Sequence, residues 1–155
     1  MLSVEVAPEP LPYRLVADTK RDLPNRPYSP STHTEWGFTS GQADFANLET
    51  LPLLQLDYSI ATDLSGRAKR DAELGVTASH LPGAVDTGKV SAATLELSYD
   101  DGASWRPVRL QRSGAGWRGK VGAPPSATYV SLRVTARDDA GNSVSQTVQR
   151  AFGLR

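Results

Sequence analysis

The sequence has no cysteine and a single methionine among its 155 residues, and aromatic residues make up only 7% of it. Without cysteine, neither a disulfide framework nor a thiolate metal site can form. Basic and acidic residues, 17 of each, cancel to a net charge of zero. A neutral chain argues against nucleic acid or an anionic membrane as the main partner. No apolar run approaches the roughly 20 residues that span a bilayer, so we expect no membrane insertion.

The N-terminal segment, MLSVEVAPEPLPY, lacks the basic start and the apolar centre of a signal peptide. Its prolines at positions 8, 10 and 12 disfavour a helix and favour an extended linker. We therefore expect residues 1–12 to be a linker or the cut end of a longer chain. Residues 13–155 are then enough for one stable domain.

The charges are divided unevenly along the chain. Residues 1–90 carry 8 Lys/Arg and 12 Asp/Glu, whereas residues 91–155 carry 9 and 5. Two oppositely charged lobes would suit docking against a neighbouring domain. Ordinary solvated strand faces explain the same distribution.

Apolar and polar residues alternate with a period of two over much of the chain, which is typical of strands with one buried face. The clearest case is 93–110, in which Leu95, Leu97 and Tyr99 alternate with polar residues before a turn at Asp100-Asp101-Gly102. The pattern predicts strands over 13–19, 34–39, 51–61, 72–80, 93–99, 105–110, 117–121, 130–137 and 144–152. The most apolar of them, 51–61, is predicted to be a central strand.

Short strands at this spacing, with no long helical pattern, predict an all-β fold. We expect an antiparallel β-sandwich of the immunoglobulin or fibronectin type III kind, with about seven to nine strands. The segment 20–50 is unusually irregular for a compact domain, so it is either functional or hides an element that the pattern misses. Within it, 41–49 is ambiguous, with one helical turn suggested at 44–48.

The hairpin turn 98–105, SYDDGASW, fits the pattern S-x-D-x-G-x-x-W. It resembles the Asp-box hairpin of sialidases and related secreted proteins. In that motif the aspartate caps the turn through backbone N–H groups and the tryptophan packs beneath it. The resemblance covers eight residues and implies a structural turn, not a catalytic one.

Two turns are rich in oxygen ligands that calcium accepts. If the two turns meet, Asp100, Asp101, Asp138 and Asp139, with Asn142, provide a weak calcium site. Both turns also join the strands of hairpins, where Asp and Asn commonly bond their own backbone. Neither has the spacing of a calcium loop, so we expect no cofactor and regard calcium as the weaker alternative.

Asp86 lies in an Asp-Thr-Gly sequence, which is also found in aspartic and subtilisin-like proteases. In those enzymes the aspartate follows a buried apolar strand, whereas Asp86 is surrounded by Gly, Ala and Lys. The two histidines, His33 and His80, have no Gly-Thr-Ser or Gly-x-Ser-x-Gly nucleophile to act on. Two histidines without cysteine also provide too few ligands for zinc. We predict no catalytic, metal or cofactor-binding residue, and no enzyme activity in this chain.

The remaining candidates are binding residues. Trp36, Trp105 and Trp117 form a sugar-stacking platform if their rings share an exposed face; we expect Trp105 to pack in a turn and Trp117 on a sheet. We also expect a stripe of basic residues on neighbouring strands, which either docks an acidic partner or is an ordinary solvated face. The stripe comprises Arg106, Arg109, Arg112, Arg118 and Lys120.

Several segments together resemble one family. These are LELSYDDGASWRPVRL, GWRGKV and YVSLRVTARDDAGNSVSQTVQRAFGLR near the C-terminus, with THTEWGFTS and LPLLQLDYSIATDLSGRA before them. They resemble the C-terminal β-sandwich of large secreted subtilisin-like serine proteases of actinobacteria, over about residues 13–155. No position matches that family's catalytic motifs.

The resemblance implies a non-catalytic accessory domain, exported with its peptidase, that stabilises the protease or positions substrate. Its partners would be the catalytic domain of the same polypeptide, and also a protein substrate or a cell-surface glycan. Two alternatives remain open: a carbohydrate- or cell-surface-binding sandwich that uses Trp36 or Trp117, and a purely structural spacer.

Overall fold

The computed structural model describes residues 5–22, 24–25, 27–41 and 48–155. The described residues contain no helix, and their strands form two sheets. None of the described segments is a helix long and apolar enough to cross a membrane. The suggested helical turn at 44–48 falls almost entirely outside the described residues.

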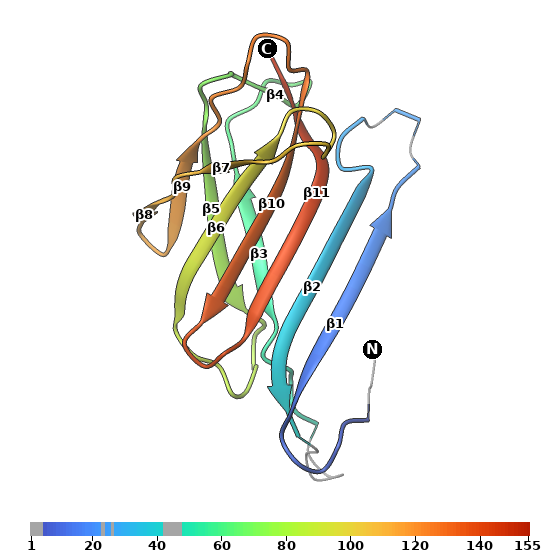
Figure 1. Cartoon of the computed structure of the whole chain (residues 1–155), viewed down its shortest axis with the longest axis vertical. Helices are drawn as coiled ribbons and strands as arrows, with labels where there is room; N and C mark the ends of the chain where they lie inside the picture. Colours follow the sequence, from blue (N-terminus) through green and yellow to red (C-terminus); the bar gives the residue numbers. More distant parts are fainter. Residues whose placement is uncertain (1–4, 23, 26, 42–47) are drawn as a thin grey trace.

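The larger sheet, called here the long sheet, has the strand order β1-β2-β11-β10-β6-β7 (Figure 1). These strands are β1 (Leu11–Lys20), β2 (Ser31–Ser40), β6 (Val90–Ser98), β7 (Arg106–Val108), β10 (Tyr129–Asp138) and β11 (Ser143–Leu154). All neighbours along this path are antiparallel. The two-residue strand β4 (Arg67–Ala68) joins the end of β11 in parallel.

The second sheet has the order β3-β5-β9-β8, all antiparallel. It contains β3 (Leu54–Ser59), β5 (Glu73–His80), β8 (Gln111–Ser113) and β9 (Gly116–Lys120). Its order matches strands A-B-E-D of an immunoglobulin-like sandwich, while β11-β10-β6 match G-F-C. The predicted antiparallel β-sandwich is therefore confirmed, with the hairpin β1–β2 added beyond the G position.

The core lies between the sheets and comes from the residues predicted to face inward. Leu95 and Leu97 of β6, Leu132 and Val134 of β10, and Val76 of β5 are each at most 2% exposed. They belong to a continuous apolar cluster that both sheets contribute to. The alternation in the sequence places every second residue in this cluster, which is why the pattern predicted these strands correctly.

The structure corrects several strand predictions. The described residues form 11 strands, because the short β4 and β8 add to the nine expected, while β7 lies within the strand expected over 105–110. The run 51–61 was predicted to be a central strand. It forms β3, which lies at an edge of the second sheet, next to β5. The irregular segment 20–50 contains the ten-residue β2, which includes the predicted strand 34–39, so the missed part is its two ends, at 31–33 and at Ser40. Strand β1 begins at Leu11, inside the expected linker.

Candidate functional site

The surface of the long sheet that faces away from the second sheet, called here the outer face, carries polar residues of small size. The register places Glu35 of β2 opposite Ser145 of β11, and Ser145 opposite Thr135 of β10. Thr135 in turn lies opposite Thr94 of β6, and their hydroxyl oxygens are 2.5 Å apart. A row of three hydroxyl side chains therefore crosses the central strands β11, β10 and β6.

Small side chains leave a groove of about 570 Å³ along this row, called here the outer groove. Its floor includes Gly37, Ala92, Thr94, Thr135, Ser143 and Ser145. A Cβ at position 37 would lie 2.8 Å from the hydroxyl of Ser143, so a larger residue there would displace that hydroxyl. Arg14, Glu35 and Arg137 also line the groove and give it charged rims. The groove can accept a polar ligand through hydroxyl groups and guanidinium donors.

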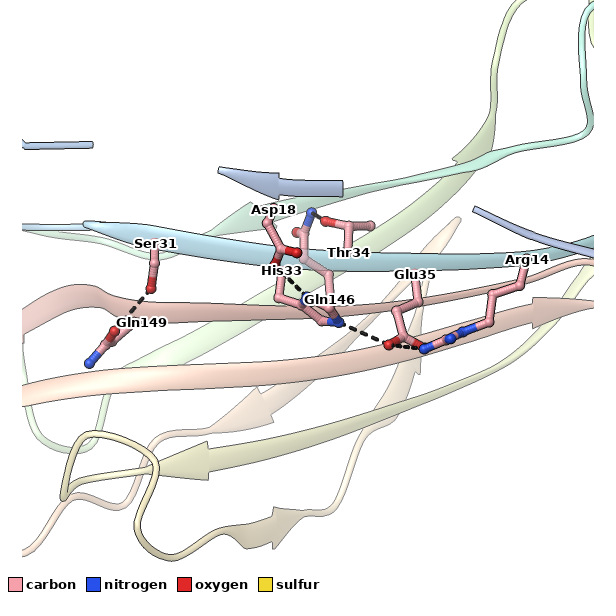
Figure 2. Close-up of polar contacts among 8 residues, drawn as sticks. All are labelled: Arg14, Asp18, Ser31, His33, Thr34, Glu35, Gln146 and Gln149. Atoms are coloured by element: carbon pink, nitrogen blue, oxygen red, sulfur yellow. Dashed lines mark hydrogen bonds and ion pairs between the residues drawn. The ribbon is translucent and has the colours of Figure 1, made fainter. Parts of the chain in front are cut away.

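A cluster of four charged or titratable side chains borders the groove on the hairpin β1–β2 (Figure 2). The Nδ1 atom of His33 is 2.6 Å from Asp18, and its Nε2 atom is 2.9 Å from Glu35. Arg14 donates two hydrogen bonds to Glu35, of 3.1 and 2.5 Å. The side chains come from alternate positions of two paired strands, so regular pleating is sufficient to bring them together.

These contacts shift the pKa values in the directions expected for ion pairs. Hydrogen bonds to Asp18 and then to Glu35 raise the pKa of His33 above its ordinary value. The hydrogen bond from Arg14, followed by that from His33, lowers the pKa of Glu35. The cluster therefore favours a protonated imidazole between two carboxylates.

A second, smaller hollow of about 260 Å³ lies on the far side of His33 along the same face. It is lined by residues that include Asp18, His33, Trp105, Thr147 and Gln149. The guanidinium of Arg133 lies 4.5 Å from the centre of the Trp105 ring. The outer face thus presents two hollows separated by the His33 cluster, with one aromatic side chain at the second.

Two hydrogen-bonded connections tie the hairpin β1–β2 to the second sheet. Trp36 donates its indole N–H to the carbonyl oxygen of Leu54, at 2.8 Å. Tyr58 donates to the side-chain oxygen of Gln146. The amide of Gln146 donates in turn to Thr34 (Figure 2). The second sheet therefore anchors β2, whereas no residue of β1 is buried.

The two aspartate-rich turns do not meet. Ser98, before the first turn, lies opposite Ser131 near the start of β10, whereas Val90 lies opposite Asp138 at its end. The turns consequently lie at opposite ends of the long sheet. Asp100, Asp101, Asp138 and Asp139 cannot share one ion, and among the described residues no three His, Asp or Glu side chains are arranged to hold a metal ion.

Each turn uses its aspartates for its own backbone. Asp100 accepts hydrogen bonds from the N–H and the hydroxyl of Ser104 and from the hydroxyl of Ser98. These bonds lower its pKa to about 2. Asp101 pairs with Arg150 at 2.8 Å. The capped turn has the geometry that the Asp-box pattern predicts for its aspartate.

Asp138 is the most connected carboxylate of the described chain. Its fully buried side chain accepts from His80, the Gly88 N–H and the Asn142 side chain at 2.7–2.9 Å. The backbone N–H groups of Ala140 and Asn142 also donate to it. Burial alone would raise the pKa of Asp138, but these donors outweigh it and hold the pKa at about 2. This carboxylate joins the β5–β6 loop to the β10–β11 turn.

His33, His80 and Asp86 do not gather around one pocket. His33 contacts Asp18 and Glu35, while His80 contacts Asp138. The backbone carbonyl of Asp86 accepts from Asn142, and its φ of 55° is in the left-handed region. Within the described residues, neither histidine hydrogen-bonds a serine hydroxyl.

The sequence-predicted binding residues are scattered. Trp117 is only 8% exposed and lies beneath the guanidinium of Arg112, and Trp36 faces the second sheet. Trp36, Trp105 and Trp117 therefore share no exposed platform. Of the stripe residues, Arg106 lies over Tyr99, Arg118 pairs with Glu73, and Arg109 is exposed.

The sequence reasoning missed the His33 cluster, although a signal for it was present. Arg14 and Asp18 are both even-numbered positions of one strand, and His33 and Glu35 alternate on the next. Recognising that the strands pair would have put the four side chains on one face. In comparisons with known proteins, no family model, no curated protein and no solved structure matches this chain.

Proposed function

We propose that the chain is a non-catalytic accessory domain of a secreted subtilisin-like peptidase, which stabilises the protease or positions its substrate. The observation that carries the proposal is the saturation of the candidate catalytic groups. Both ring nitrogens of His33 are bonded to carboxylates, and Nε2 of His80 is bonded to Asp138. Groups committed in this way support a scaffold and are poorly arranged for proton transfer to a substrate.

The family likeness of the sequence segments supports the peptidase part of this proposal. The partner is then the catalytic domain of the same polypeptide, and the outer groove is the surface available to it. Arg14, Glu35 and Arg137 at the rims provide charges of both signs for such a contact.

A second candidate is the binding of a cell-surface glycan on the outer face. It is favoured by the hydroxyl-lined groove and by the neighbouring hollow that contains Trp105, His33 and Asp18. Side chains of these types supply hydrogen bonds and one aromatic surface to a sugar. This candidate replaces the Trp36 and Trp117 platform with Trp105.

The first test examines the reading frame upstream of this chain and the effect of deleting the domain from the protease. A catalytic region with its own triad is expected ahead of Leu2, and removing residues 13–155 is expected to shorten the half-life of the protease on heating. The isolated chain is expected to leave casein intact. Absence of a catalytic region, or cleavage of casein by the chain alone, would contradict the proposal.

The second test separates glycan binding from docking. Polysaccharides are titrated while tryptophan fluorescence is followed, with Ser145→Arg as a variant that fills the outer groove. No saturable shift with any glycan, together with loss of protease stabilisation in Ser145→Arg, favours docking. A saturable shift that Ser145→Arg or Trp105→Ala abolishes favours the glycan. Ser59→Arg, on the exposed part of β3, is the matched control.

A further inference from the structure

Strand β1 is a long, exposed edge of the sheet (Figure 1). It ends the strand order and, among the described residues, pairs along its ten residues with β2 alone. None of its residues is buried, and Val16 at its centre is 41% exposed. An edge of this kind offers a row of unpaired backbone groups to another strand.

The hairpin's hydrogen bonding identifies which backbone groups point outward. The N–H of Arg21 donates to the carbonyl of Pro30, at the closed end of the β1–β2 ladder. Since the direction alternates along a strand, odd-numbered residues of β1 face β2 and even-numbered ones face the free edge. The outward groups therefore belong to Pro12, Arg14, Val16, Asp18 and Lys20.

The charges on this edge are complementary to those on the same edge of a second copy. Arg14 and Asp18 lie two positions on either side of Val16, on the same outer face. In an antiparallel pair of two β1 strands with Val16 opposite Val16, each Arg14 lies opposite Asp18 of the other strand. Among antiparallel registers, this one alone brings Arg14 and Asp18 together, and it does so twice.

We propose that two copies of this chain dimerise by antiparallel pairing of their β1 strands, with a two-fold axis at Val16. The pairing joins the two long sheets into one continuous sheet. It also places Arg14 of one copy next to Asp18 of the second copy. The charged clusters of the two copies then form one row, from Glu35 and Arg14 of the first to Asp18 and His33 of the second. This inference does not depend on the proposed function, because it uses only the edge, its register and its charges.

The opposite face of β1 contributes apolar contact. Tyr13 and Leu15 are half-buried and Ala17 is exposed on the inner side of the hairpin. In the proposed register, Leu15 lies opposite Ala17 of the second copy. The two Leu15 side chains are then diagonal neighbours across the axis, and each Tyr13 lies opposite Thr19 of the second copy. Pro12 lacks a backbone donor, so the shared ladder weakens only at its two ends.

Occupation of this edge by an unrelated strand is disfavoured by the same residues. Arg14 and Asp18 have no oppositely charged partners in a strand that lacks matching charges at these two positions. Charged edge residues act in this way in sheets that resist aggregation. A symmetric copy is therefore the occupant that the charge pattern fits.

Sedimentation velocity of the 155-residue chain over a range of concentrations measures the dimer directly. The wild-type chain is expected to form a dimer that weakens with added salt. Val16→Pro removes an outward N–H that β2 does not use, so it is expected to give a folded monomer. A chain that stays monomeric at its highest soluble concentration, or a dimer that Val16→Pro leaves intact, would overturn the proposal.

Charge reversal provides the matched control. Arg14→Asp and Asp18→Arg each bring like charges together twice, and each is expected to weaken self-association by about tenfold or more. Mixed in equal amounts, the two variants are complementary and are expected to form a heterodimer, detectable with one variant labelled. Failure of the mixture to associate better than either variant alone would contradict the β1 pairing. Capture of a foreign strand by a monomeric wild-type chain would do the same.

Discussion

The indole N–H of Trp36, on β2, donates a 2.8 Å hydrogen bond to the carbonyl oxygen of Leu54, on β3. It thereby fastens the N-terminal hairpin, which lies beyond the seven strands of the immunoglobulin-like order, to the opposite sheet. Leu54 is only 1% exposed, so its carbonyl has little access to water if this donor is lost.

Trp36→Phe is therefore expected to lower the free energy of unfolding by about 1–2 kcal/mol, the cost of leaving a buried acceptor without its donor. Trp105→Phe is the matched control, because the Trp105 N–H has no hydrogen-bond partner among the described residues. Urea unfolding measures both variants. Equal losses in the two would show that ring volume, not the hydrogen bond, is responsible.

Asp138→Asn is expected to destabilise the protein by about 3 kcal/mol. The new side-chain amide would place its own N–H donors against groups that now donate hydrogen bonds to the buried carboxylate. The control is Asp57→Asn, at an exposed position of β3, which is expected to be nearly neutral. Thermal unfolding at neutral pH distinguishes them. A neutral effect of Asp138→Asn would contradict the joining role of this side chain.

The same carboxylate predicts an acid dependence. The pKa of Asp138 is about 2 in the folded protein, below its ordinary value of 3.8. A depressed pKa contributes stability above the ordinary value, and that contribution is lost as the pH falls from 3.8 towards 2. The melting temperature of the wild-type protein is expected to fall over this range more steeply than that of Asp138→Asn.

His33 predicts a dependence of opposite sign. Its pKa is raised from 6.5, so its contribution is fully present below pH 6.5 and is lost as the pH rises through the folded-state value. The melting temperature is expected to decline over that window in the wild-type protein and to stay flat there in His33→Gln. NMR titration of the imidazole checks the pKa itself, and a value at or below 6.5 would refute the prediction.

Leu97→Ala tests the core between the sheets. Leu97 is 0% exposed, and removing its buried side chain is expected to cost about 3 kcal/mol. Leu64→Ala, at a fully exposed turn residue, makes the same chemical change and is expected to cost almost nothing. Chemical denaturation compares the two, and similar values would contradict the assignment of the core.

Much of this architecture could be predicted from alternation alone. Leu95 and Leu97 of β6, and Val130 to Ala136 of β10, alternate because one face meets the second sheet, and both strands are as expected. The turn glycines 102 and 141 have positive φ, as the turn patterns required. These features depend on local alternation and on turn residues, so they could be predicted from the sequence alone.

Features that depend on pairing between distant strands could not be predicted in the same way. The full length of β2 was missed because Ser31 to His33 are polar. They gain their strand conformation by pairing with β1, and Thr32 and His33 also pair with β11. The His33 cluster and the outer groove depend on the same pairing. The separation of the two aspartate turns follows from the antiparallel register of β6 and β10, which no single segment specifies.

The position of β11 between β2 and β10 has a consequence for how the chain acquires its structure. Gly37 lies opposite Ser143, so two segments more than a hundred residues apart must meet before the N-terminal hairpin has a sheet to join. Closing so large a loop is slow compared with forming a local hairpin. We expect β1–β2 to form early on the ribosome and to remain undocked until β10–β11 has emerged, which leaves the free edge of β2 exposed to chaperones during synthesis.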